Sequence, residues 1–454
     1  MRPLEIFLTI FLVVSACSLV SKSLFRPWVW LVVDVVFLLA HLFLEGAHWQ
    51  MIPAYGSVVL FAGVVALQVS GMRILLASAM VVLCLATIGL SAVLPMFRLP
   101  APTGPYPIGT RVIHLPAPDG PGQHGRELMI QVWYPAAPSR RPFAPYRRRE
   151  ETTLQSSYQS VVPTHSRLEA PVMGGDERFP VLLFSPAWGG RRTQNTYLME
   201  DLASHGYVVA GIDHPGNSGP TAFPDGRVDQ PGSVERLDFS KQSYDEIEAT
   251  LERELTRQTA DEIQVLNDLE RRNETPGDPF YQRLDTARAG ALGHSFGAAV
   301  GAEAALEDNR ILAVLDLDGS IYGRVQREGL PKPFLFISED ASVPLAAPAA
   351  AKLSRMDQIN NRLDENDAAM LRHYGALRLF VHGSSHESYT DHPLFSPLQS
   401  LSGAGTISKY RQYSIVRQYA LAFFDKTLRG EDPQLLKDVP GPFPEATLEV
   451  VPAS

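Results

Sequence analysis

The sequence predicts an α/β protein with a mostly parallel central sheet, preceded by an N-terminal bundle of about four transmembrane helices. Two observations lead to this prediction. The first 98 residues consist of long apolar runs, and after Pro100 short apolar runs alternate with stretches of helical periodicity. At 454 residues the chain is also long enough for more than one domain. We therefore expect a helical membrane part over residues 1–98 and one α/β domain over residues 99–454.

The apolar runs of the first part have the length of transmembrane helices. They cover roughly residues 4–20, 28–44, 52–70 and 74–94. A helix needs about 20 apolar residues to cross the hydrocarbon core of a bilayer. Four such runs in succession predict a multi-pass membrane protein. Asp34 and His41 fall inside the second run, and we expect them to face other helices rather than lipid.

Basic residues near the four runs favour one orientation in the membrane. Lys22 and Arg26 lie in the first loop and Arg73 in the third, whereas the second loop has no basic residue. Because basic loops tend to stay in the cytoplasm, both termini and the α/β domain are predicted to lie on the extracytoplasmic side.

The rest of the chain is acidic and lacks cysteine. The whole chain carries a net charge of −9, and the first 98 residues, with five basic and three acidic side chains, contribute +2 of it, which leaves −11 for residues 99–454. Nucleic acid is therefore excluded as a partner, because phosphate binding depends on Lys and Arg. Both cysteines, Cys17 and Cys84, fall in the apolar part, so the α/β domain has no disulfide, thiol nucleophile or cysteine metal site. We expect no cofactor and no metal.

Short apolar runs mark the strands of the expected sheet. Strands are predicted at residues 110–115, 127–134, 180–185, 207–212, 288–293, 311–317, 333–338 and 376–382, and helices at 193–205, 243–272, 296–307 and 409–428. Residues 135–179 are rich in Pro, Arg, Ser and Gln and are predicted to be an irregular insertion. Residues 340–373 are interpreted as a second excursion, placed to cover a site.

One motif carries the strongest chemical signal. Gly293-His294-Ser295-Phe296-Gly297 follows a predicted strand and opens a helix rich in small residues. A G-x-S-x-G sequence in this context is the nucleophile elbow of the α/β-hydrolase fold, whose tight turn requires small flanking residues and lifts the serine hydroxyl clear of the sheet. Ser295 is therefore the predicted nucleophile, and the fold class becomes an α/β-hydrolase.

A serine nucleophile needs a histidine base, and the chain offers one in the expected place. In this fold the order along the chain is serine, acid, histidine. The last predicted strand runs into Gly383-Ser384-Ser385-His386. A loop beyond the carboxyl end of a strand can bring an imidazole to the elbow, so His386 is the predicted base.

The acid that orients the histidine is left open by the spacing. Asp318 follows the strand 311–317, and Asp340 follows the next strand, which is the commoner position in this fold. Asp316 lies two residues before Asp318, on the same side of the strand, so only Asp318 is clear of it.

Two backbone N–H groups are predicted to bind the oxyanion that forms during acyl transfer. One belongs to Phe296, the residue after the nucleophile. The other is expected from Trp188, in the loop that follows the strand 180–185. The small residues around Trp188 allow a close approach of the backbone.

Taken together, these stretches resemble the platelet-activating factor acetylhydrolase family, in the group of the plasma enzyme and its bacterial relatives. The matching segments are FSPAWGGRRT (184–193), DLASHGY (201–207), IDHP (212–215), FPDGR (223–227), GHSFGA (293–298), LDG (317–319) and GSSH (383–386). The resemblance covers most of residues 105–430. It implies that Asp318 is the acid, that Trp188 and Phe296 supply the oxyanion donors, and that no calcium is needed. One departure is Pro186-Ala187, where the family usually has His-Gly.

The resulting hypothesis is a serine carboxylic-ester hydrolase that works through an acyl-enzyme. By resemblance, its substrates are phospholipids with short or oxidised acyl chains. A general carboxylesterase or polyester hydrolase would use the same residues. A protein of another class, a catalytically silent membrane receptor or scaffold with this fold, would not require all of Ser295, Asp318 and His386.

Overall fold

The computed structural model of the chain describes residues 1–21, 26–68, 71–117, 126–232, 237, 241–339, 355–438 and 440–453. Contacts group the chain into two compact units. The first contains Met1–Arg98, Pro145–Pro163 and Leu394–Ser402, and the second contains Leu99–Ala144, Thr164–Pro393 and Gly403–Ser454. Two segments from far along the chain therefore pack with the first 98 residues.

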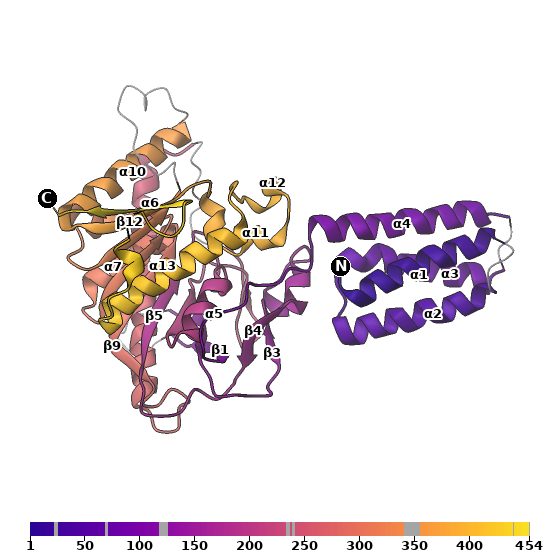
Figure 1. The fold of residues 1–454 in the computed structure, drawn as a ribbon, viewed down its shortest axis with the longest axis horizontal. Coiled ribbons are helices and arrows are strands. Elements are labelled where there is room, and N and C mark those ends of the chain that lie inside the picture. The colour runs from indigo at the N-terminus through magenta and orange to yellow at the C-terminus, as the bar shows by residue number, and fades with distance from the viewer. Residues whose placement is uncertain are drawn as a thin grey trace. The chain divides into compact units, whose positions relative to one another are not determined.

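The first unit contains a bundle of apolar helices (Figure 1). They are α1 (Pro3–Val20), α2 (Pro27–Ala40), α3 (Ile52–Ala66) and α4 (Arg73–Val93), and a π-helical turn, His41–Glu45, continues α2. Helix α1 packs on α2 and α4, and α3 packs on α2 and α4. Among the described residues, four helices are long and apolar enough to cross a membrane, by length and composition alone: Pro3–Val20, Pro27–Glu45, Trp49–Ala66 and Arg73–Val93. Their ends lie within a few residues of the predicted runs.

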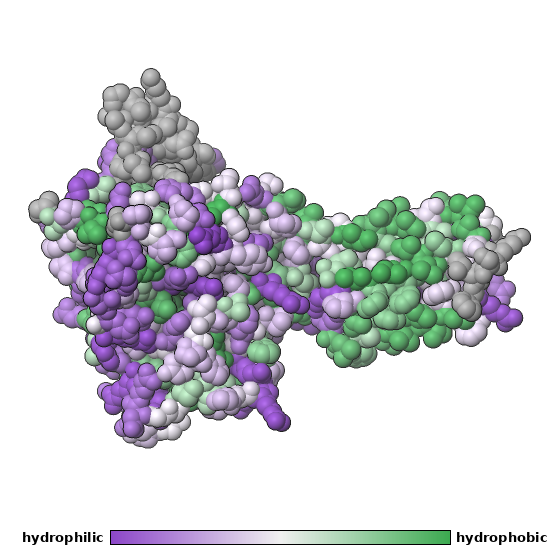
Figure 2. Space-filling model, viewed as in Figure 1, coloured by the Kyte–Doolittle hydropathy of each residue, from purple (hydrophilic) through white to green (hydrophobic). Residues whose placement is uncertain are grey.

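Apolar side chains cover both the inside and the outside of this bundle. Leu12 and Phe61 are fully buried between the helices, whereas Val59 and Leu75 are exposed on the outside. Figure 2 shows apolar surface gathered over these helices. A helix that is apolar all round suits either a large core or a lipid environment.

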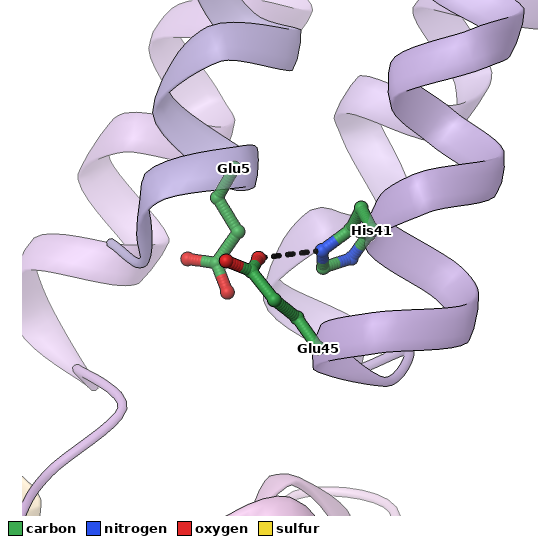
Figure 3. A group of neighbouring side chains, drawn as sticks. All are labelled: Glu5, His41 and Glu45. Atoms are coloured by element: carbon green, nitrogen blue, oxygen red, sulfur yellow. Dashed lines mark hydrogen bonds and ion pairs between the residues drawn. The ribbon is translucent and has the colours of Figure 1, made fainter.

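Several polar groups inside the bundle are paired with one another. Asp34 is fully buried and accepts a hydrogen bond of 2.6 Å from Ser15 Oγ. At the end of the bundle where α1 begins and α2 ends, His41 Nδ1 lies 3.1 Å from Glu45 Oε2, beside Glu5 (Figure 3). Ligand atoms of these three side chains lie within 4.8 Å of one another, a spacing that suits a metal ion. The guanidinium of Arg2 forms an ion pair with Glu5, so this end already holds a cation of its own.

Aromatic residues join the later segments of the first unit to the end of α4. The ring of Phe97 packs 5.0 Å from Tyr146 and 5.0 Å from Phe395, measured between centroids. Ser396 Oγ donates a hydrogen bond of 2.7 Å to the carbonyl of Val93. A fragment lacking the first 98 residues would therefore expose an apolar surface on segments 145–163 and 394–402.

The second unit is built on an eleven-stranded sheet of order β13-β12-β11-β10-β9-β5-β6-β2-β1-β4-β3. The strands are β1 (Ile108–Leu115), β2 (Leu128–Pro135), β3 (Phe143–Pro145), β4 (Pro163–Leu168), β5 (Phe179–Ser185), β6 (Val208–Asp213), β9 (Leu284–His294), β10 (Ile311–Leu317), β11 (Phe334–Ser338), β12 (Ala376–Val381) and β13 (Ala446–Val451). From β6 through β12 every neighbouring pair is parallel. The predicted mostly parallel sheet is confirmed.

Helices cover both faces of the central strands. On one face, α6 (Tyr244–Glu274) and α7 (Phe296–Glu307) contact each other and β5 and β9. On the other, α5 (Thr196–Ser204) and α13 (Lys409–Arg429) contact each other, with α5 on β6 and α13 on β9. Strands buried on both faces form continuous apolar runs, which is why β5 and β10 are recognisable from the sequence. The parallel strands bring their carboxyl ends to one edge, where the predicted site residues lie.

The prediction was wrong where elements are short or only partly apolar. The supposed irregular insertion, residues 135–179, contains β3 and β4, which extend the edge of the sheet. Strand β13 at the opposite edge was also missed; it alternates buried and exposed residues over only part of its length. The second excursion stays a prediction: residues 355–373 of it belong to the helix α10 (Arg355–Tyr374), and residues 340–354 lie outside the described part.

Candidate active site

Ser295 occupies a strained turn between a buried strand and a helix. It lies between β9 and α7 with φ 56° and ψ −126°, a backbone conformation that residues other than glycine rarely adopt. A Cβ on Gly293 would lie 2.1 Å from the carbonyl carbon of Gly297, and a Cβ on Gly297 would lie 2.0 Å from the Ser185 carbonyl oxygen. Only glycine fits at either position, so the sequence Gly-x-Ser-x-Gly dictates this turn.

Asp318, just beyond β10, makes direct contact with a histidine. Its Oδ2 accepts a hydrogen bond of 2.7 Å from His386 Nδ1. Its Oδ1 accepts another, of 2.9 Å, from the backbone N–H of Glu339. Both carboxylate oxygens are thus engaged, which holds the side chain in one orientation. The alternative acid, Asp340, lies outside the described residues.

The neighbouring carboxyl of Asp316 has a different environment. It is fully buried and accepts a hydrogen bond of 2.6 Å from the Gly319 backbone N–H. Burial, reinforced by the nearby Asp367, raises the pKa of Asp316 well above its ordinary value. Burial thus favours the neutral form of Asp316, which serves as a structural group inside β10.

His386 begins a short 3₁₀ turn, η5 (His386–Tyr389), a few residues after β12. Burial opposes protonation of the ring, but the hydrogen bond and the negative charge of Asp318 outweigh burial, so the pKa of His386 is raised above its ordinary value. Because Nδ1–H donates to Asp318, Nε2 carries the lone pair that can accept a proton. Nearly half of the side chain remains exposed.

The loop of residues 185–190, called here the oxyanion loop after its predicted role, has one N–H group with no acceptor among the described residues. The N–H of Ala187 donates to Gln194 Oε1 at 3.2 Å, and that of Gly189 donates to Asn217 Oδ1 at 2.7 Å. Between them, the N–H of Trp188 finds no acceptor in the part of the chain that the structure describes. This is the arrangement expected of an oxyanion donor.

Phe296 is the first residue of α7, so its N–H has no partner within the helix. Its ring packs edge-on against that of Trp188, with centroids 5.2 Å apart, and lies 5.9 Å from the ring of Tyr322. The two predicted donor residues are therefore neighbours, and their rings form an apolar wall at the site.

His294, inside the elbow motif, is a polar residue whose part in the site was missed from the sequence. The ring is completely buried and stacks 4.5 Å from the ring of His386. Burial is the main cause that lowers the pKa of His294 to about 3, so the ring is neutral at ordinary pH. The middle positions of a G-x-S-x-G motif have no required identity, so no sequence signal pointed to this residue.

A second group of polar residues lies beneath the oxyanion loop. His214 Nδ1 lies 2.9 Å from Asp261 Oδ2, and His214 Nε2 lies 3.2 Å from Ser185 Oγ. Ser185 Oγ in turn donates a hydrogen bond of 2.7 Å to Glu262 Oε2, and burial raises the pKa of Glu262 to about 7. The sequence Ser–His–Asp along these hydrogen bonds resembles a catalytic triad, but all four side chains are buried and cannot meet a substrate. Because Asp261 and Glu262 belong to α6, the hydrogen bonds attach the start of the oxyanion loop to that helix.

A nucleophile elbow at the carboxyl edge of a mostly parallel sheet, with an Asp–His pair from the loops beyond β10 and β12, defines an α/β-hydrolase. The comparisons with known proteins identify the family within that class. The family described as platelet-activating factor acetylhydrolase, isoform II, matches residues 131–435. The chain belongs to this family.

Individual relatives are distant but agree with the family. The chain is 26% identical over 292 residues to a probable 1-alkyl-2-acetylglycerophosphocholine esterase of Arthroderma benhamiae, covering 60% of this chain and 66% of the relative. It is 27% identical to the platelet-activating factor acetylhydrolase of Canis lupus familiaris, covering 41% and 46%. The chain thus spans less than two thirds of the length of these curated relatives.

A solved structure shows the same likeness over most of the fold. A ferulic acid esterase from Streptomyces cinnamoneus superposes with a TM-score of 0.61 at 30% sequence identity, covering 78% of this chain and 99% of that one. The family and this structural relative are both ester hydrolases of the α/β-hydrolase type.

Proposed function

We propose that the protein is a membrane-embedded serine esterase that hydrolyses short-chain carboxylic esters, with Ser295 as nucleophile, His386 as base and Asp318 as the orienting acid. The observation that carries the proposal is the Asp318–His386 hydrogen bond of 2.7 Å beside the strained elbow. A histidine held by a carboxylate, with its other nitrogen free, is the base that a serine hydroxyl requires.

The reaction would proceed in two halves. In the first, Nε2 of His386 takes the proton of Ser295 as Oγ attacks the ester carbonyl, and the imidazolium then gives this proton to the leaving alcohol. In the second, water loses a proton to Nε2 and attacks the acyl-enzyme, and Ser295 recovers its proton as the acid leaves. Asp318 stabilises the imidazolium in both halves without itself taking a proton. The N–H groups of Trp188 and Phe296 would bind the oxyanion each time.

The proposed substrates are phospholipids with an acetyl or other short acyl chain. The names of the fungal and canine relatives, an acetylglycerophosphocholine esterase and a platelet-activating factor acetylhydrolase, support this class. The apolar wall formed by Trp188, Phe296 and Tyr322 is suited to a small acyl group. The mechanism uses only side chains and backbone N–H groups, so we propose that hydrolysis does not depend on calcium. A broader carboxylesterase activity is the second candidate, because the similar solved structure is a ferulic acid esterase.

We also propose that α1–α4 span a membrane and hold the hydrolase on its extracytoplasmic side. Support for the spans comes from the length and apolar composition of the helices. Support for the orientation comes from Lys22, Arg26 and Arg73, which fall in the first and third loops of the sequence.

The test of this function uses the full chain in detergent micelles. Hydrolysis is measured on 1-alkyl-2-acetyl-glycerophosphocholine, on its long-chain 2-acyl analogue and on ethyl ferulate, each with and without EGTA. We expect the acetyl phospholipid to be preferred, EGTA to have no effect, and Ser295→Ala to abolish hydrolysis while Ser139→Ala does not. Preference for ethyl ferulate would favour the second candidate. No hydrolysis of any ester by a folded protein would favour a binding role.

A further inference from the structure

Gln194 lies at the start of the turn before α5 and connects three loops of the candidate site. Its side-chain Oε1 accepts a hydrogen bond of 3.2 Å from the N–H of Ala187, next to Trp188 in the oxyanion loop. Its Nε2 contacts Nδ1 of His294 at 2.6 Å, and Nε2 of His294 lies 3.0 Å from the backbone carbonyl of His386. A continuous chain of hydrogen bonds therefore runs from the oxyanion loop through the elbow to the base.

Only one arrangement of protons satisfies this chain. The carbonyl of His386 can only accept, so His294 must carry its proton on Nε2. Because burial keeps His294 neutral, its Nδ1 then has a lone pair and must accept from the amide of Gln194. The side-chain oxygen of Gln194, Oε1, then faces the N–H of Ala187, which can only donate. Each partner fixes the next, so the amide orientation and the tautomer are both determined.

The main chain around Gln194 also holds the far end of the loop that begins at His386. The Gln194 carbonyl accepts a hydrogen bond of 2.9 Å from the N–H of Asp391. The carboxylate of Asp391 accepts one of 2.8 Å from the N–H of Thr196 at the start of α5, and Asn195 Nδ2 donates to the carbonyl of Tyr389. Residues 386–391, called here the histidine loop, are therefore attached to the Gln194 turn at both ends.

We propose that Gln194 is a positioning residue that, through His294, sets the distance between the base His386 and the oxyanion donor Trp188. The inference rests on the proposed function, because it assigns Gln194 a task in that same site. His294 directly precedes Ser295 in the chain, so the nucleophile belongs to the same hydrogen-bonded assembly. A shift of about 1 Å in such an assembly lowers the rate of the chemical step about 100-fold.

The deciding variant is Gln194→Met, which nearly preserves the volume and removes both side-chain hydrogen bonds. Its matched control is Gln131→Met, which removes the hydrogen bond of 3.2 Å from another buried glutamine to Thr110 Oγ1, in β2 away from the site. For Gln194→Met we expect kcat to fall about 10- to 100-fold, with KM changed less than about two-fold. The acidic limb of kcat/KM should also move to lower pH, because a displaced His386 loses part of the support of Asp318.

Gln194→Glu separates the hydrogen bond from the packing. A carboxylate keeps the acceptor for Ala187 but replaces the donor to His294 with a second acceptor, so Nδ1 of His294 must carry a proton. His294 then either turns a lone pair toward the His386 carbonyl or becomes an imidazolium whose positive charge lies beside the His386 ring. We expect a loss of kcat comparable to that of Gln194→Met. Unchanged kcat and an unchanged pH profile in both variants, or the same losses in Gln131→Met, would overturn the proposal.

The same assays distinguish this inference from the proposed function itself. If the unsubstituted protein hydrolyses esters and Ser295→Ala does not, the proposed function stands whatever the Gln194 variants do. If the unsubstituted protein hydrolyses no ester, the proposed function fails, and with it the role assigned to Gln194. The thermal midpoints of Gln194→Met and Gln131→Met should agree, which would show that the loss of rate is not a loss of folded protein.

Discussion

Oδ2 of Asp318 lies 2.7 Å from Nδ1 of His386, although 68 positions separate the two residues in the chain. The contact joins the loop after β10 to the loop after β12, two parallel strands separated in the sheet only by β11. Parallel strands place their carboxyl ends at one edge, which is why distant loops can build one site there.

The first prediction concerns the charge of this pair. Asp318→Asn keeps the shape but loses the negative charge that orients and stabilises the imidazolium, and we expect kcat to fall about 10⁴-fold. The matched control is Asp316→Asn two residues earlier, where a buried carboxyl with a raised pKa is replaced by an amide that can still accept from Gly319. Steady-state kinetics of the two variants measure this difference. An equal fall of kcat in both would contradict the role of Asp318.

The second prediction is a pH dependence. His386 acts as a base only when neutral, so kcat/KM should fall as the pH drops through its pKa. Because Asp318 raises that pKa, the midpoint should lie above the value of about 6.5 of a free histidine. In Asp318→Asn the midpoint should move down. A wild-type midpoint well below 6, measured with an ester whose alcohol leaves readily, would count against the assignment.

The third prediction separates the backbone of Trp188 from its ring. Trp188→Ala keeps the N–H, whereas Trp188→Pro removes it. Loss of one oxyanion donor lowers kcat about 10²- to 10³-fold, so we expect a loss of that size in the proline variant beyond any loss in the alanine variant. Equal kcat values in the two variants, at equal thermal midpoints, would show that the Trp188 N–H does not meet the oxyanion.

The elements that the sequence predicts best are those determined by local or strongly periodic patterns. The helix α7 has its predicted bounds, and the elbow turn follows from Gly293 and Gly297, whose positions exclude any side chain. The edge strands β3, β4 and β13 were missed because a strand paired on one side and partly exposed has no continuous apolar run. The prediction of four apolar helices agrees with the structure in number and approximate bounds.

The site was only partly predictable for a related reason. Ser295 and His386 could be predicted because each lies in a recognisable loop after a strand. The spacing made Asp318 and Asp340 equally good candidates for the acid, and only the resemblance to a family favoured Asp318. Gln194 and His294 carry no local signal at all. Their hydrogen bonds join segments about 100 and 92 residues apart, and only the tertiary structure brings these segments together.

The fourth prediction concerns stability. Burial raises the pKa of Glu262 from 4.5 to about 7, so the folded protein holds a proton that the unfolded chain releases. Below pH 4.5 the carboxyl is protonated in both the folded and the unfolded chain, so Glu262 does not destabilise the fold. As the pH rises from 4.5 to about 7, the free energy of unfolding falls, because only the unfolded chain loses the proton. Glu262→Gln cannot ionise and should be more stable than the parent at pH 8, on the order of 3 kcal/mol.

Thermal midpoints at pH 5.5 and pH 8 measure this difference. Glu252→Gln, a change at an exposed carboxylate, serves as the control. The parent and the control should lose stability between the two pH values by the same amount, and Glu262→Gln by less. An identical loss in all three proteins would mean that Glu262 is already ionised in the folded state.

The most direct test of the central claim is covalent labelling of the full chain with a fluorophosphonate, followed by peptide mass mapping. The full chain is required because segments 145–163 and 394–402 pack with residues of the first 98. We expect a single modified residue, Ser295, no labelling of Ser295→Ala, and much slower labelling of Asp318→Asn than of Asp316→Asn. A folded protein that is not labelled, or is labelled at another serine, would contradict the catalytic assignment of Ser295, Asp318 and His386.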